Sequence, residues 1–191
     1  MINKVLFIMP SLNRQSIHKA IDSLYRQTDD RWNLCIVYDN TDSMRVHPCE
    51  KISCINLKTK LGKHKNSAGL VRNVGIDKNI EKYKWIAFLD DDDIVSNEYV
   101  DLIFNKYNVY DFVIFRMNIK IKNRHSITIP RSATNKEIKC SNVGISFCYQ
   151  SKFSDIRFRA SSTEDFLFLK QLEKKTDNFT ISDEIGYYVN H

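Results

Sequence analysis

Four consecutive aspartates, Asp90, Asp91, Asp92 and Asp93, are the residues of this sequence most able to do chemistry. Adjacent carboxylates repel one another and raise each other's pKa unless a positive charge lies between them. A hard divalent cation such as Mg²⁺ or Mn²⁺ is the natural counter-charge, and it usually keeps open positions for substrate phosphates. For a generic acidic run, a solvated turn that caps the next helix is the commoner interpretation. Here an apolar run at residues 85–89 precedes the acids, which favours a ligand site at the end of a strand.

A second candidate is Arg72, which lies in an otherwise apolar segment at residues 67–75. An arginine in such a segment is often a surface residue whose stem packs against the protein. Its guanidinium could instead clamp a carboxylate or a phosphate by paired hydrogen bonds. The segment alone does not decide between these two interpretations.

Short apolar runs in the first half predict strands at residues 4–9, 34–38, 52–57 and 85–89. Helices are expected after Ser16, a candidate N-cap, and from Ser67. The residues expected to face the sheet recur at helical spacing: Ile17, Ala20, Ile21 and Leu24 in the first helix, and Leu70, Val71, Val74 and Ile80 in the second. Strands that alternate with helices indicate an α/β protein with a mainly parallel sheet.

Polar residues follow these strands, with Ser11 and Asn13 after the first and Asp39 after the second. The carboxyl edge of such a sheet is where ligands bind, so these residues should gather there with the aspartates. In the second half we expect helices at residues 97–107 and 164–174, strands at residues 111–115, 127–129 and 146–149, and a last strand through Tyr188. No repeat or convincing linker is visible, so the sequence predicts one domain over residues 1–191.

Composition excludes several classes of protein. With 191 residues, 42% hydrophobic and 27% charged, the chain is expected to be globular rather than disordered. Its apolar runs are far shorter than the ~20 residues that cross a bilayer, and no signal peptide is visible. Five cysteines without a close pair predict reduced thiols rather than disulfides or a zinc site. We therefore expect a soluble cytoplasmic protein, in the host cytoplasm if it is viral.

The order of motifs resembles the nucleotide-sugar glycosyltransferases of the GT-A fold, in particular the large inverting family 2. Their opening strand ends in Pro-x-x-Asn. It is followed by an aspartate cluster, an Ala-x-x-x-Arg-Asn-x-Gly segment and an Asp-x-Asp motif. The matching residues here are 10–13, 39–42, 68–75 and 90–92. Downstream, the loop at residues 142–144, the Glu-Asp pair at residues 164–165 and the C-terminal His191 also match. The resemblance covers nearly all of the chain and implies a Rossmann-like first half.

Carried over residue by residue, the resemblance implies that Asp39 reads the base of a nucleotide-diphosphate sugar, most simply a UDP-sugar. Asp90 and Asp91 would lie near the ribose and the metal, while Asp92 and His191 would bind the Mn²⁺ or Mg²⁺. The other positions implied to line the donor site are Pro10, Ser11, Arg72, Gly144 and Glu164. Residues 1–95 would thus form the nucleotide and metal half, and residues 96–191 the acceptor half.

The resemblance implies that Asp165 is the general base of an inverting transfer, because it follows the family's Glu-Asp motif. A base on the face opposite the leaving group takes the proton of the acceptor hydroxyl, as a carboxylate activates water in inverting hydrolysis. A bound cation would stabilise the charge that develops on the departing diphosphate. Glu164 and Asp165 could also simply meet the dipole of the helix that they begin, and both roles are compatible.

The sequence departs from the family pattern at three points. Residues 39–42 read Asp-Asn-Thr-Asp, where the family usually has paired acids followed by Gly-Ser, which makes the base preference less certain. Four aspartates in a row leave open which two form the Asp-x-Asp pair. The chain is also short for the family and ends at the candidate histidine ligand, as a minimal enzyme or the catalytic domain of a longer protein would.

Residues 116–139 hold seven basic residues and one acid, as much net charge as the +6 of the whole chain. A solvated loop is the default interpretation. The alternative is an anionic acceptor such as modified DNA, a phosphorylated glycan or a lipid-linked sugar. Two other functions stay open: a non-catalytic module that binds nucleotide sugars or nucleic acid, and a metal-dependent nucleotidyltransferase. The second usually needs a glycine-rich loop, and residues 10–14 contain no glycine.

Overall fold

The computed structural model describes residues 1–62, 68–79, 82–121, 125–134 and 136–189. Its nine-stranded sheet has the order β3-β2-β1-β4-β8-β6-β9-β5, with β7 paired to β6. The strands are β1 (Ile2–Ser11), β2 (Trp32–Tyr38), β3 (Ile52–Asn56), β4 (Tyr83–Phe88), β5 (Ile94–Val95), β6 (Phe112–Ile119), β7 (Ile127–Ile129), β8 (Phe147–Gln150) and β9 (Phe179–Val189). The α-helices are α1 (Ile17–Tyr25), α2 (Gly69–Lys78), α3 (Tyr99–Asp101) and α4 (Glu164–Glu173), and short π- and 3-10 helices span Leu102–Lys106 and Ser151–Phe153.

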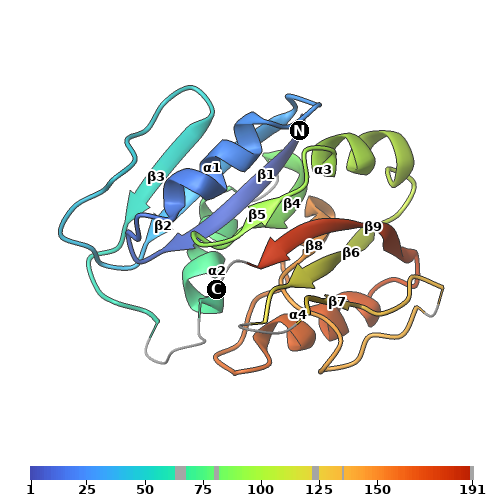
Figure 1. Cartoon of the computed structure of the whole chain (residues 1–191). Coiled ribbons are helices and arrows are strands. Elements are labelled where there is room, and N and C mark those ends of the chain that lie inside the picture. The colour runs from blue at the N-terminus through green and yellow to red at the C-terminus, as the bar shows by residue number, and fades with distance from the viewer. Residues whose placement is uncertain (63–67, 80–81, 122–124, 135, 190–191) are drawn as a thin grey trace.

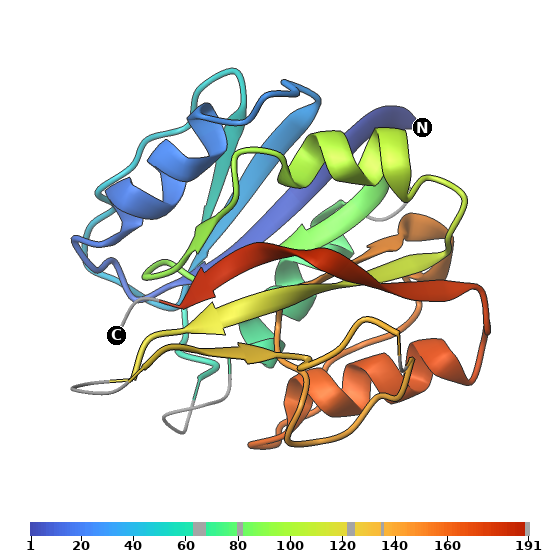
Figure 2. The ribbon, with the colours of Figure 1, turned by 45° about the vertical axis from the view of Figure 1, so that its right-hand side comes forward.

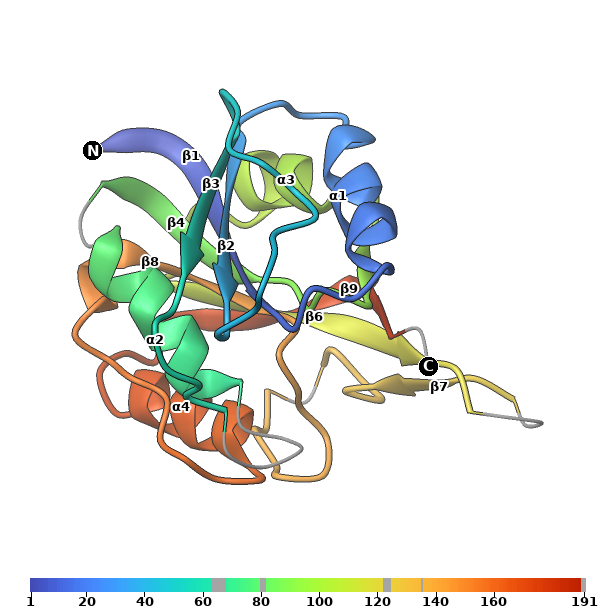
Figure 3. The same ribbon diagram turned by 90° about the vertical axis from the view of Figure 1, so that its left-hand side faces the viewer.

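Helices cover both faces of the sheet. Figure 3 shows α1 and α3 on one face and α2 and α4 on the other. The predicted inner face of α1 is confirmed, because Ile17, Ala20, Ile21 and Leu24 are all buried. Ser16 stands at the N-cap position, but its hydroxyl caps no backbone N–H within the described residues. The predicted α/β class with a sheet between helix layers is therefore confirmed.

The first half of the sheet is parallel, as the alternation of strands and helices predicts. β1 lies between β2 and β4 and pairs in parallel with both, with Met9 opposite Ile36 and Phe7 opposite Ala87. β3 continues the parallel arrangement beyond β2. In Figure 1 the four strands β3, β2, β1 and β4 run side by side. Their carboxyl ends consequently share one edge.

The second half adds strands of both directions, so the complete sheet is mixed. β8 runs antiparallel to β4 and β6, whereas β9 runs parallel to β6 and antiparallel to β5. In Figure 2, β9 lies between β6 and β5. Antiparallel neighbours need no helical crossover, so β6, β7 and β8 follow one another without a helix between them.

Two helices differ from the prediction in detail. The inner face of α2 is formed by Val71, Arg72, Gly75 and Ile76, whereas Val74 and Leu70 are only half-buried; Ile80 lies outside the described residues. Gly75 is required by close packing, since a Cβ there would lie 2.5 Å from Ile8 Cγ2. The helix expected at residues 97–107 begins as α3 and continues as a π-helix over Leu102–Lys106.

An aromatic cluster fixes α4 against the sheet. The Phe88 ring of β4 contacts Phe147 and Phe158 edge-on, with ring centroids 5.4 and 5.1 Å away, and Phe168 of α4 packs 4.4 Å from Phe158. Such aromatic pairs add to the stability gained by burial. The cluster holds the first turn of α4 close to the residues that follow β4.

The described residues contain no helix that is both long and apolar enough to cross a membrane. All five cysteines are free, with Cys35 and Cys148 buried and Cys49 and Cys140 exposed.

Candidate active site

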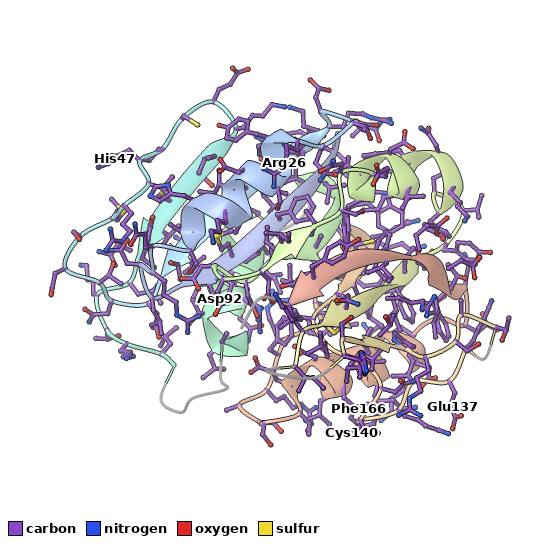
Figure 4. The ribbon with its side chains drawn as sticks, in the orientation of Figure 1. Arg26, His47, Asp92, Glu137, Cys140 and Phe166 are labelled. Carbon is purple, nitrogen blue, oxygen red and sulfur yellow. The ribbon has the colours of Figure 1, made fainter. Side chains whose placement is uncertain are left out.

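Polar side chains gather at the edge of the sheet where β1, β2 and β4 end. The backbone turns sharply there, because Asn13 and Asn40 take positive φ values of 62° and 57°, a region that asparagine tolerates better than most residues. Ser11 and Asp39 are buried at the ends of their strands. Figure 4 shows Asp92 at this same edge. The gathering predicted from the strand ends is thus confirmed.

The aspartates after β4 have different surroundings. Asp91 is buried and accepts hydrogen bonds from Ser11 Oγ at 2.7 Å and from the Leu12 N–H at 3.1 Å. Burial raises the pKa of Asp91, and the hydrogen bond from Ser11 and the charge of Arg14 offset only part of that rise. Asp92 is more open, with 29% of its side chain exposed, and is paired with Arg14. Of these two carboxylates, Asp92 is the one that can reach a ligand.

Arg72 is the centre of a second cluster and is 3% exposed. Its guanidinium contacts Asp90 at 2.5 Å and Glu164 at 2.8 Å, and lies 3.9 Å from Asp165. Burial acts to lower the pKa of Arg72, but the three carboxylates outweigh it and raise the pKa. The surface interpretation of Arg72 is therefore wrong, and the clamp interpretation is confirmed with carboxylates as its partners.

Glu164 joins two helices. Its Oε1 accepts hydrogen bonds from Arg72 and from the Gly69 N–H at 2.9 Å. Burial is the main reason that the pKa of Glu164 is raised, and the charge of Arg72 opposes the rise. Although Glu164 begins α4, its carboxylate satisfies an N–H in the first turn of α2. The helix-capping role expected of this residue thus serves the neighbouring helix.

Asp165 lies beside this cluster with 28% of its side chain exposed. Burial raises its pKa to about 7; the charge of Arg72 lowers the pKa, and the charges of Asp90 and Glu164 raise it further. Its Oδ1 is buried and has no hydrogen-bond partner within the described residues. A carboxylate that titrates near neutral pH, with part of its surface open, has the properties of a general base.

Asp39, which is expected to bind the nucleotide base, accepts hydrogen bonds from the backbone of its own chain. Its two carboxylate oxygens accept hydrogen bonds from the Leu61 N–H at 2.6 Å and the Gly62 N–H at 2.9 Å. The residue thus ties the loop after β3 to the end of β2. A carboxylate has further lone pairs, so these contacts leave it able to accept another N–H.

Other predicted residues form none of the ion pairs of the carboxylate clusters or lie outside the described chain. Pro10 precedes Ser11 on β1. Gly144 packs against β6, where a Cβ would lie 2.8 Å from Met117 Sδ. His191, Lys122 and Arg124 lie outside the described residues.

The described part of the basic stretch is partly structural. Arg116 donates hydrogen bonds to the carbonyl oxygens of Pro130 and Asp183, both at 3.1 Å. Lys139 pairs with Glu137 at 2.7 Å, and Lys136 lies 5.7 Å from the centre of the Tyr110 ring. The stretch is therefore neither a wholly solvated loop nor a uniform patch of unpaired charge.

Two residues of the site, Arg14 and Tyr187, are not among those predicted from the sequence. Arg14 contacts Asp91 and Asp92, and the fully buried Tyr187 of β9 accepts a hydrogen bond from the Asp90 N–H at 3.1 Å. Arg14 directly follows the Pro-x-x-Asn turn, so its charge beside that motif was a usable signal. Nothing in the sequence brings Tyr187 next to Asp90, because the two are far apart along the chain.

The donor set suits a metal that is shared with a substrate. Within the described residues, no three His, Cys, Asp or Glu side chains are grouped so as to hold a metal ion. Mg²⁺ and Mn²⁺ commonly need only one or two carboxylates, since phosphates and waters complete their coordination. The partly exposed carboxylate of Asp92 meets that requirement, and Arg14 shows that the position already attracts a positive charge.

Comparisons with known proteins found a matching family model and similar solved structures. The glycosyl transferase family 2 profile matches residues 6–184. The structure of S. aureus TarS residues 1–349 is similar to this chain with a TM-score of 0.73 and 19% identity, over 98% of this chain and 60% of that one. The complex of the same TarS residues with UDP-GlcNAc has a TM-score of 0.74 and 20% identity, over 98% of this chain and 58% of that one. Their complex with UDP has a TM-score of 0.71 and 20% identity, over 97% of this chain and 60% of that one.

At this identity the TarS structures establish the fold, which is the GT-A fold expected above. The chain spans about 60% of the length of these TarS chains. No curated protein sequence matches the chain. With a family profile matched over residues 6–184, and with the fold and the motif residues in agreement, the chain belongs to glycosyl transferase family 2.

Proposed function

We propose that this chain catalyses metal-dependent, inverting transfer of a sugar from a nucleotide-diphosphate sugar, most simply a UDP-sugar, to an acceptor hydroxyl. The observation that carries the proposal is Asp165, whose partly exposed carboxylate lies 3.9 Å from the buried Arg72 at the carboxyl edge of the sheet. In this assignment residues 1–95 bind the nucleotide and the metal. Residues 96–191 supply the base and meet the acceptor.

Asp165 would act as the general base. Its carboxylate accepts the proton of the acceptor hydroxyl while that oxygen forms a bond to the anomeric carbon, and the bond to the diphosphate breaks on the opposite face. The product sugar then has the inverted configuration. A pKa near 7 suits this step, because about half of the base is ionised at neutral pH and the carboxylate still binds a proton well.

The donor side is assigned to the strand ends of the first half. Asp39 lies at the end of β2 and accepts from backbone N–H groups in the structure, so an N–H of a nucleotide base is a suitable partner for it. Asp92, together with His191 from outside the described residues, would hold the Mg²⁺ or Mn²⁺. The bound ion would offset the negative charge of the leaving diphosphate.

Arg72 and Glu164 are assigned to the donor site next to Asp90, with Ser11 holding Asp91 in place. The TarS structures with UDP-GlcNAc and with UDP support a uridine nucleotide as the first donor to test, since they share this fold. Two acceptor classes fit a basic second half: a glycan, including a phosphorylated or lipid-linked one, and modified DNA.

The first test is nucleotide binding by calorimetry, with UDP, GDP and CDP in the presence and absence of Mn²⁺. We expect one nucleotide to bind at least about tenfold more tightly with Mn²⁺, and Asp92→Asn to lose that gain. Asp177→Asn, an exposed carboxylate after α4, is the matched control and should behave as the wild type. Metal-independent binding, or none, would contradict the metal-dependent assignment.

The second test is a screen of nucleotide sugars for donor turnover, followed by acceptor trials with glycans and with DNA that carries modified bases. NMR of the product should show the anomeric configuration opposite to that of the donor. Retention of configuration would contradict the single-displacement mechanism. Binding without turnover of any donor would favour the alternative function, a non-catalytic module of the same fold.

A further inference from the structure

Arg14 holds its guanidinium against two of the consecutive aspartates. It lies in the turn after β1, and its Nη1 is 3.3 Å from Asp91 Oδ1 and in direct contact with Asp92 Oδ2. Within the described residues its guanidinium has no other hydrogen-bond or ion-pair partner. The charge that adjacent carboxylates require is therefore supplied by the protein itself.

The two contacts of Arg14 differ in how easily they can be broken. Asp91 is buried and is fixed by Ser11 and the Leu12 N–H, so it cannot turn toward a ligand. Asp92 is 29% exposed and Arg14 is 48% exposed, and ion pairs at such exposure are weak and separate readily. Asp92 is thus the carboxylate that can exchange Arg14 for another cation.

We propose that Arg14 is a built-in counter-cation that occupies Asp92 until a divalent ion displaces it. This inference rests on the proposed function, in which Asp92 binds the metal. The guanidinium that leaves Asp92 remains beside Asp91, and its planar N–H groups are well shaped to pair with a diphosphate. Arg14 therefore weakens metal binding by the empty protein and favours uptake of the ion together with the donor.

The test is a titration with Mn²⁺ in the absence of nucleotide, followed by the EPR signal of the free ion. Arg14→Gln should bind Mn²⁺ about threefold to tenfold more tightly than the wild type, because the competing cation is gone. Arg14→Lys should remain close to the wild type. Asp92→Asn should lose Mn²⁺ binding whether it is introduced into the wild type or into Arg14→Gln.

Arg26→Ala is the control, because it removes the same charge from an exposed residue just beyond α1. Figure 4 shows Arg26 over α1, well away from Asp92. Its affinity for Mn²⁺ should stay within about twofold of the wild type, because exposed charges far apart are screened. An equal gain in Arg26→Ala and Arg14→Gln would overturn the inference in favour of a general charge effect.

Two further outcomes separate the inference from the proposed function. If the wild type and Arg14→Gln bind Mn²⁺ with equal affinity, and Asp92→Asn does not bind, the inference is wrong while the metal assignment stands. If neither the wild type nor Arg14→Gln binds Mn²⁺, with or without UDP, the metal assignment fails and the inference fails with it. If Arg14→Gln binds Mn²⁺ more tightly than the wild type and Arg26→Ala does not, the result supports both the inference and the metal assignment.

Discussion

Asp165 is held in surroundings that favour its protonated form. Its Oδ1 is buried without a hydrogen-bond partner within the described residues, and two other carboxylates lie close by. Arg72, at 3.9 Å, opposes them and favours the ionised form. A carboxylate placed in this way costs the folded protein stability at neutral pH, which is common where a residue is positioned for chemistry.

Asp165→Asn should therefore stabilise the protein at alkaline pH. The folded pKa of about 7 exceeds the unfolded value near 4, so the stability that Asp165 contributes is present at low pH and is lost as the pH rises through about 7. We expect the variant to gain about 1–3 kcal/mol at about pH 8 and little at about pH 4. Urea denaturation at both pH values measures the difference, and a loss of stability at pH 8 would contradict this account.

Glu164→Gln should move the acid limb of the pH–rate profile. The charge of Glu164 raises the pKa of Asp165, so a neutral residue of the same shape should lower that pKa and move the limb toward lower pH. Gln can still accept the hydrogen bond from Gly69, which limits structural change. The value of kcat/KM against pH reports the shift, and movement of the limb toward higher pH would exclude the electrostatic coupling described here.

The meeting of α2 and α4 is the element-scale feature that builds the Arg72 cluster. Glu164 of α4 accepts hydrogen bonds from the Gly69 N–H and from Arg72, both on α2. Asn73 of α2 also exchanges two hydrogen bonds with the backbone of Phe158, each 2.9 Å long. The residues proposed for the donor site and for the base are thereby fixed relative to one another through two helices and one loop.

Gly69→Ala tests this contact. A Cβ at residue 69 would lie 2.6 Å from Phe158 Cβ and 2.7 Å from Glu164 Oε2, so the helices must separate although alanine favours helix. We expect a loss of about 1–3 kcal/mol in the free energy of unfolding, together with reduced turnover. Gly144→Ala is the control for stability alone, because its Cβ would meet only the flexible end of Met117. Equal and small effects of both substitutions would show that the helices are not tightly joined.

Sequence patterns predict elements better than the contacts between them. The strands of the first half follow directly from apolar runs such as Phe7 to Met9, because a buried parallel strand is apolar on both faces. The sequence does not predict the inner face of α2 correctly, because the charged Arg72 lies on that face. The carboxylates of Glu164, at the start of α4, and of Asp90, just after β4, make that burial tolerable, and the sequence does not show that they meet.

Over the whole molecule, the site joins segments that are distant along the chain. Asp90 follows β4, Glu164 begins α4 and Tyr187 lies on β9, and the antiparallel pairing of β8 with β4 brings these parts together. Motif order identifies the family without this pairing. The charge of Arg14 beside the Pro-x-x-Asn turn is visible in the sequence, although its contact with Asp92 is not. The contact of Tyr187 with Asp90 could not be predicted, because it exists only after the sheet is complete.

The distribution of charge in the folded chain also differs from a simple division into acidic and basic parts. The carboxylates at the sheet edge are matched by Arg14 and Arg72, while Arg116 in the basic stretch ties β6 to backbone carbonyls. The net charge of +6 therefore leaves fewer unpaired basic side chains for an acceptor than the sequence indicates.

Donor turnover by Asp165→Asn tests the central claim most directly. With the donor and acceptor identified for the wild type, we expect kcat to fall by at least about a hundredfold, while binding of the nucleotide with Mn²⁺ stays within about twofold. Asp177→Asn should keep full turnover. Near-normal turnover by Asp165→Asn, with intact nucleotide binding, would show that another group accepts the proton and would contradict the account.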